Sequence, residues 1–219
     1  GRGGSILWLW DRSDRTKNGT IYFNSLLTAR PDSVATLGKT TLDINRLSKE
    51  IVALQDTPSN VGILYSQNSV PYSDEMLDII KSVSAYLGEN GQKTRFVVES
   101  DSNKMFDYGM MIVPNSVSIT EQTFEKLKKF VANGGTLLII GDDALTVNEY
   151  GDAFNKSDVD AIKNKSVTMS FEDAGTSISG ESKKELRKVI TRLVEKNGYD
   201  RVKIVDKATG EKITEGDFI

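Results

Sequence analysis

The middle of the chain alternates between short apolar runs and helical patterns, and this alternation limits the fold more than any other feature. The apolar runs suit buried strands and lie at Val61–Tyr65, Thr94–Val98, Met110–Val113 and Thr136–Ile140. Strands that read as unbroken apolar runs between helices are buried on both faces. The pattern therefore predicts an α/β protein whose helices cover both sides of a mainly parallel sheet.

Helical patterns surround these runs. Before them, apolar residues recur at steps of three and four and predict one long amphipathic helix from Arg30 to about Gln55, with Pro58 as a stop. Between the second and third runs the chain is too short for a full helix, so the form of that crossover stays open. The polar residues suited to cap the later helices are Ser73, Ser118 or Thr120, and Ser182.

The outer parts of the chain carry weaker signals. Residues 5–10 are apolar enough for a buried strand, 166–171 for an edge strand, and 201–214 for a hairpin. A lone hairpin is marginally stable, so we expect its sheet partners to lie beyond this sequence. Together with a first residue other than Met, this predicts a piece cut from a longer protein, with a processed mature protein as the alternative.

Composition narrows the possible chemistry. The 219 residues include no histidine and no cysteine, which removes Ser-His-Asp and Cys-His catalysis and the ordinary zinc, copper and haem sites. The formal net charge of -3 gives no electrostatic reason to expect nucleic acid or an anionic membrane as partner. Without cysteine, the redox compartment cannot be read from disulfides. We expect no cofactor and no resident metal.

Candidate binding residues lie where the predicted strands end. In an open α/β sheet, ligands bind beyond the carboxyl ends of the strands, and there the sequence places Ser66, Asn68, Asn115 and Asp142. The loop after the first run has no glycine, which favours an ordinary polar loop over a flavin phosphate site. Asp142 and its neighbour Asp143 have the oxygen ligands of a divalent cation site, but such pairs are also common in solvated loops.

A tryptophan pair near the start of the chain is a second candidate. Trp8 and Trp10 are two residues apart and so face the same side of a strand, with Asp11 beside them. Aromatic faces stack on the C–H faces of sugar rings, and the carboxylate could bond hydroxyls. The alternative, a core or interface pair, is the better interpretation for this chain alone. No pair of carboxylates has the context of a general acid and base.

Several segments resemble one family. The stretch from Ile6 to Asp11, residues 23–27 and the pattern at 42–47 resemble the last barrel strand and final helix of the family 42 glycoside hydrolases, which include β-galactosidases. Residues 61–65, 106–114 and 134–140 resemble the trimerisation domain that follows the barrel. That domain is related in fold to class I glutamine amidotransferases, whose nucleophile elbow would be Gly-x-Cys-x-Gly; this chain has none.

The resemblance implies a division of the chain and a role for it. It implies a barrel remnant over residues 1–57, a flavodoxin-like trimerisation-type domain over 58–199, and the start of a β-rich domain over 200–219. The catalytic carboxylates would lie on earlier barrel strands, so we expect a non-catalytic structural and oligomerisation domain of a β-galactosidase-like glycoside hydrolase. The candidate surfaces for self-association are the helix face with Phe124 and Phe130, and the helix at 34–54. A small-molecule or carbohydrate-binding domain is the alternative.

Overall fold

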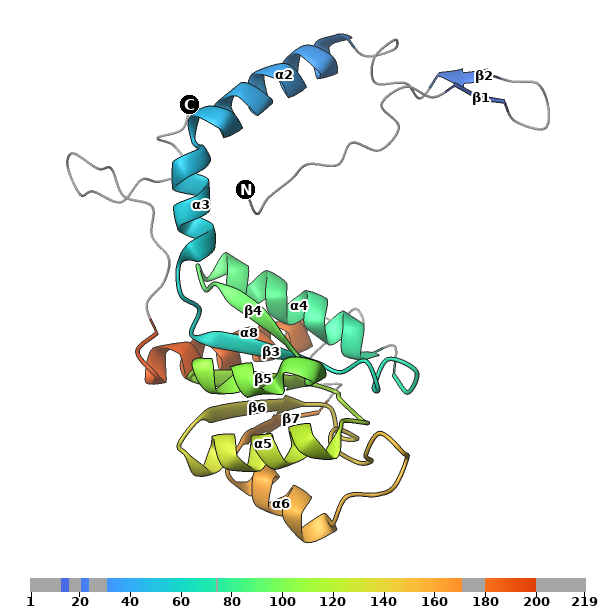
Figure 1. Ribbon diagram of the computed structural model, residues 1–219, viewed down its shortest axis with the longest axis vertical. Coiled ribbons are helices and arrows are strands. Elements are labelled where there is room, and N and C mark those ends of the chain that lie inside the picture. Colours follow the sequence, from blue (N-terminus) through green and yellow to red (C-terminus); the bar gives the residue numbers. More distant parts are fainter. Residues whose placement is uncertain (1–12, 16–20, 24–30, 74, 171–179, 200–219) are drawn as a thin grey trace. The chain divides into compact units, whose positions relative to one another are not determined.

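The chain forms two compact units, Gly1–Thr57 and Pro58–Ile219. The computed structural model in Figure 1 describes residues 13–15, 21–23, 31–73, 75–170 and 180–199. The apolar run at 5–10, with Trp8, Trp10 and Asp11, and the hairpin expected at 201–214 lie outside the described residues. Among the helices that are described, none is sufficiently long and apolar to cross a membrane.

The described residues of the first unit form a pair of short strands and two helices. Strand β1 (Ser13–Arg15) pairs antiparallel with β2 (Ile21–Phe23), and helices α2 (Pro31–Arg46) and α3 (Ser48–Asp56) follow. The prediction of one unbroken helix is therefore wrong. Leu47 has a ψ of 16°, far from the value of about −42° in an α-helix, so the helix is interrupted there.

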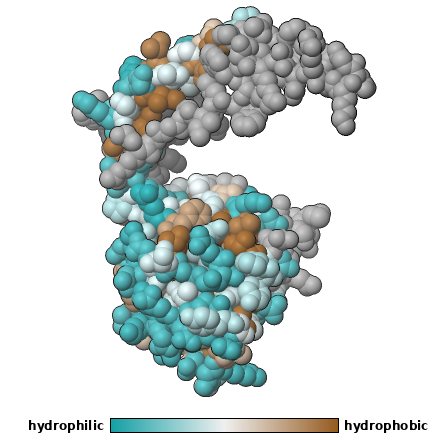
Figure 2. All heavy atoms as spheres, turned by 45° about the vertical axis from the view of Figure 1, so that its right-hand side comes forward, coloured by the Kyte–Doolittle hydropathy of each residue, from teal (hydrophilic) through white to brown (hydrophobic). Residues whose placement is uncertain are grey.

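Helices α2 and α3 keep an exposed apolar stripe in the described structure. No residue of α2 is buried, and Leu42 is 70% exposed. Ile44, Leu47 and Val52 are also exposed, and Figure 2 shows the hydrophobic side chains along these helices. The sequence thus predicted the helical spacing of these apolar residues. In the described structure, however, they remain exposed.

The second unit is built on an open, fully parallel sheet. Its strand order is β4-β3-β5-β6-β7, so the strands take the order 2-1-3-4-5 when numbered as they occur. This confirms the predicted α/β class and the mainly parallel sheet. The strands are β3 (Val61–Tyr65), β4 (Thr94–Val98), β5 (Met110–Pro114), β6 (Thr136–Ile140) and β7 (Val167–Met169).

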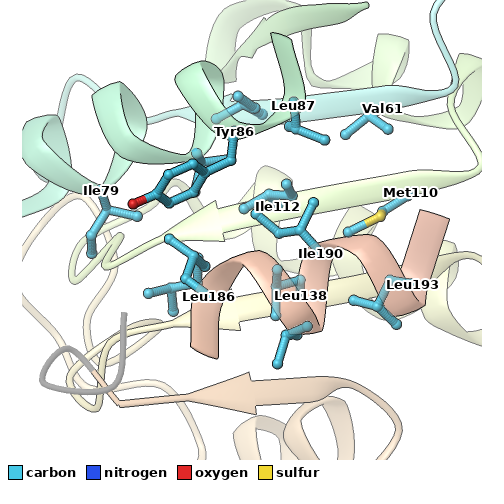
Figure 3. Packing of buried hydrophobic residues seen from close by; sticks show 14 of the residues in the cluster. Val61, Ile79, Tyr86, Leu87, Met110, Ile112, Leu138, Leu186, Ile190 and Leu193 are labelled. Carbon is cyan, nitrogen blue, oxygen red and sulfur yellow. The ribbon is translucent and has the colours of Figure 1, made fainter. Parts of the chain in front are cut away.

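Helices cover both faces of the inner strands β3, β5 and β6, which are apolar on both faces. The prediction that Thr94–Val98 is buried on both faces is wrong, because β4 lies at the edge of the sheet with Phe96 and Val98 exposed. On one face, Ile63, Ile112 and Leu138 pack with residues of α4 (Glu75–Glu89) and α8 (Gly180–Lys196). Figure 3 shows Ile112 and Leu138 of the sheet beside Leu186 and Ile190 of α8. On the other, Leu64 and Val113 belong to a cluster with residues of α5 (Glu121–Ala132) and α6 (Lys156–Asn164). Alternate residues of one strand thus enter opposite cores.

The structure also corrects several local expectations. The open crossover is the 3-10 helix η1 (Glu99–Asp107), and helix α6 was not predicted. Helix α8 begins two residues before Ser182. Phe124 and Phe130 are each 3% exposed, so the helix face proposed for self-association is part of the core. The prediction failed because an amphipathic pattern does not reveal whether the apolar face of a helix packs on its own sheet or on another chain.

Tyr199 gives a testable pH dependence. It packs against Gly109 at the end of the described chain, and burial raises the pKa of the Tyr199 hydroxyl above its ordinary value of 10.0. Because the pKa is raised, the Tyr199 hydroxyl keeps its proton to a higher pH in the folded state than in the unfolded chain. This contribution to the free energy of unfolding is complete below about pH 10 and is lost as pH rises through the folded pKa. Urea unfolding from pH 8 to 11 should show a smaller decline in Tyr199→Phe than in wild type, and equal declines would contradict the assignment.

Candidate functional site

The candidate site is the carboxyl edge of the sheet, where the strand order reverses between β3 and β5. Successive crossovers leave this point on opposite sides, so the loops after the two strands diverge and leave a crevice. The loops after β3, β5 and β6 lie on this side of the sheet in Figure 1. The structure places Ser66 and Asn115 directly after β3 and β5, as predicted from the strand ends.

Glu99 is the centre of a hydrogen-bond network at this edge. It directly follows β4 and is 8% exposed. Its Oε2 accepts hydrogen bonds from Asn68 Nδ2 at 2.9 Å and Ser66 Oγ at 3.0 Å. Its Oε1 accepts one from the backbone N–H of Thr120 at 2.7 Å. Thr120 is the N-cap of α5, so the carboxylate also lies at the positive end of that helix dipole.

Ser118 connects the loops after β3 and β5. Its carbonyl oxygen accepts hydrogen bonds from the hydroxyls of Ser66, at 2.7 Å, and Ser69. Its backbone N–H donates to Ser69 Oγ at 3.0 Å. Ser66, Ser69 and Ser118 are each at most 1% exposed, so these loops satisfy one another's polar groups inside the crevice.

Asn115 is held in a left-handed conformation with a φ of 34°. Its Nδ2 donates to Glu75 Oε2 at 2.8 Å and to Ser73 Oγ at 3.0 Å. Its Oδ1 is buried and lacks a hydrogen-bond partner among the described residues. Oδ1 lies against Gly141, the first residue after β6, whose φ is 103°. A Cβ at position 141 would collide with Oδ1 and lie 2.6 Å from Asn115 Cγ.

This contact limits the chemistry of the edge. A nucleophile elbow places its nucleophile on a sharp turn directly after a strand. In this chain that position after β6 is Gly141, and Asn115 fills the space that a side chain would need. A nucleophile therefore cannot stand there without displacing Asn115.

Asp142 follows Gly141, the residue against which Asn115 packs. It is exposed, and its carbonyl oxygen accepts a hydrogen bond from Lys163 Nζ at 3.2 Å. It borders a hollow of about 250 Å³ between β6, α6 and β7. Within the described parts of the chain, no three residues of metal-ligating type converge, at Asp142 and Asp143 or elsewhere.

The sequence prediction found part of this edge and missed part. It named Ser66, Asn68, Asn115 and Asp142, but the structure joins only Ser66 and Asn68 in one network. Glu99 was missed, although it directly follows β4 and the same rule would have selected it. The positions of Trp8, Trp10 and Asp11 stay untested, since they lie outside the described residues.

Comparison with known proteins supports a likeness of fold. No family model matches the sequence, and no curated protein matches it. Among solved structures, the apo exo-carrageenase GH42 from Bacteroides ovatus is 18% identical with a TM-score of 0.60, and the match covers 84% of this chain and 24% of that one. The chain thus spans about a quarter of that relative's length.

Two further matches are partial. The β-galactosidase from Rahnella sp. R3 is 17% identical with a TM-score of 0.39, over 45% of this chain and 16% of that one. The β-galactosidase from Bacillus circulans sp. alkalophilus is 18% identical with a TM-score of 0.37, over 44% and 15%. Likeness this low carries no argument about fold. The match to the exo-carrageenase, with its TM-score of 0.60, shows that this chain has the fold of a segment of a GH42 protein.

Proposed function

We propose that this chain is a non-catalytic structural and oligomerisation part of a larger glycoside hydrolase that acts on galactose-containing glycans. The observation that carries the proposal is the fold likeness to the exo-carrageenase, which extends over 84% of this chain but only 24% of that one. The proposed divisions are a barrel remnant over 1–57, a trimerisation-type domain over 58–199 and the start of a β-rich domain over 200–219.

Strand order and the carboxyl edge support the same proposal. The order 2-1-3-4-5 is the order of flavodoxin-like doubly wound sheets, which is the fold that a domain related to class I glutamine amidotransferases would have. At the switch point of such a sheet, ligands usually bind. Here Ser66, Ser69 and Glu99 bond to neighbouring loops in that crevice. These contacts between loops support a framework role.

The proposal predicts two results for the purified chain. The chain should release no measurable nitrophenol from nitrophenyl β-galactoside, because the catalytic carboxylates would belong to a preceding barrel. It should also self-associate in sedimentation velocity, with α2 and α3 as the candidate surface, since Leu42 and Ile44 are exposed there. Turnover would contradict the non-catalytic role, and a monomer at every concentration would contradict the oligomerisation role.

A matched pair of variants locates the surface. Leu42→Asp places a charge on the exposed stripe of α2 and should shift sedimentation toward the monomer. Lys39→Asp changes an exposed residue of the same helix without removing an apolar group, so it should leave the oligomer in place. If both variants sediment like wild type, self-association uses another surface.

A further inference from the structure

Two exposed tyrosines lie close together on the loops of the carboxyl edge. Tyr72, in the loop after β3, is 57% exposed, and Tyr150, in the loop after β6, is 80% exposed. The hydroxyl of Tyr72 is 3.9 Å from the point where a Cβ would stand on Gly151, the residue next to Tyr150. The loops that carry the two tyrosines are therefore close in space although they are far apart in the sequence.

The turn that carries Tyr150 is rigidly built. Asn148 is 5% exposed, and its Oδ1 accepts hydrogen bonds from the backbone N–H groups of Tyr150 and Asp152, each at 2.9 Å. Its Nδ2 donates to Glu121 Oε1 at 3.0 Å, and its backbone N–H donates to the Asp152 carbonyl. The backbone that carries Tyr150 is thus ordered by hydrogen bonds, and an ordered backbone reduces the conformational entropy lost when an aromatic residue binds a ligand.

The same hydrogen bonds connect this turn to Tyr72. Ser118 Oγ donates to the Asn148 carbonyl at 2.9 Å, and Ser69 Oγ donates to the Ser118 carbonyl. The backbone N–H of Tyr72 then donates to the Ser69 carbonyl at 3.0 Å. A chain of polar contacts thus connects the backbones of the two loops that carry the tyrosines.

From this geometry we propose that Tyr72 and Tyr150 form a surface binding site for a neutral, galactose-rich oligosaccharide. Tyrosine rings offer flat apolar faces that stack on the C–H faces of sugars, and their hydroxyls can bond sugar hydroxyls. Carboxylates flank the rings in the sequence at Glu149 and Asp152, both exposed, and they can accept hydrogen bonds from further hydroxyls. The choice of a sugar as ligand, and of galactose, rests on the function proposed above.

Charge favours a neutral sugar over an anionic one. Glu75, Glu149 and Asp152 are exposed at or beside the tyrosine loops. A sulfated or carboxylated sugar would approach these carboxylates with the same sign of charge, which disfavours binding. Neutral hydroxyls meet no such repulsion.

Isothermal titration calorimetry of the full chain with a neutral β-1,4-galacto-oligosaccharide tests the site. We expect binding by wild type and a loss of affinity of about tenfold or more in Tyr72→Ala and in Tyr150→Ala. Tyr150→Phe should keep most of the affinity because the ring remains. Phe96→Ala is the matched control, since it removes another exposed aromatic ring, 54% exposed on β4, and should bind like wild type.

Each other outcome overturns the site. Absence of binding by wild type, or equal binding by wild type and both alanine variants, would contradict it. Stronger binding of a sulfated galacto-oligosaccharide than of the neutral one would contradict the charge argument. The sedimentation and hydrolysis measurements are independent of this titration, so the framework role can stand while the sugar site fails, and the reverse.

Discussion

Replacing Gly141 with alanine should lower the free energy of unfolding by roughly 3 kcal/mol. The φ of 103° at this residue is a conformation that side chains rarely adopt, and the new Cβ would collide with Asn115 Oδ1. Strained backbone and overpacking each cost about 1–3 kcal/mol. Asn115 cannot move away easily, because its Nδ2 is bonded to Glu75 and Ser73. Urea denaturation measures the change.

Two controls separate the causes. Gly134 also has a positive φ, 87°, but nothing lies within 4 Å of its absent Cβ, so Gly134→Ala should cost only about 1 kcal/mol. In the double variant Gly141→Ala with Asn115→Gly, the side chain whose Oδ1, Cγ and Cβ cause the collision is gone, and part of the stability should return. If Gly141→Ala costs no more than Gly134→Ala, Asn115 does not close this position.

Replacing Glu99 with alanine should lower the free energy of unfolding by about 3 kcal/mol. The change leaves Asn68 Nδ2 and the N–H of Thr120 without their acceptor at a largely buried position. It also removes a negative charge from the amino end of α5, which contributes about 0.3–1 kcal/mol. Glu99→Gln should lose less, because the amide oxygen can still accept from Thr120.

Glu125→Ala is the control for Glu99→Ala. Glu125 also makes a charged contact, with Lys128 at 3.0 Å, but it is exposed on α5. Exposed ion pairs contribute about 0–1 kcal/mol, so this variant should unfold almost like wild type. Equal stability of the two alanine variants would mean that the Glu99 network contributes no more than a surface ion pair.

Glu99 and Asn115 both contribute to the packing of the loops at the carboxyl edge. Glu99 bonds to Ser66 and Asn68 from the loop after β3, and Asn115 packs over Gly141 after β6. The crevice at the switch point is thus filled from both sides by side chains of the chain itself. Exposed groups that remain free to meet a ligand lie further out, at Tyr72 and Tyr150.

The sequence by itself determined the main strands of the parallel sheet, because each is a local apolar run, whereas β1 (Ser13–Arg15) and β2 (Ile21–Phe23) were not predicted. Val61–Tyr65, Thr94–Val98 and Thr136–Ile140 were predicted at the bounds that the structure has. The N-cap at Thr120 and the helix end before Gly134 were likewise readable, since caps depend on residues a few positions apart. Helix α6 was missed because its short pattern is mostly polar, with Ile162 as its buried residue.

Only the tertiary structure decided which side chains meet. Phe124 and Phe130 fit a surface stripe equally well as a core face, and it is the packing of α5 on the sheet that buries them. Glu99 and Asn68 are 31 residues apart, and the loops of Tyr72 and Tyr150 are close in space only because parallel strands bring them to one edge. Local patterns fix local elements, whereas contacts between distant residues depend on strand order, which no short segment encodes.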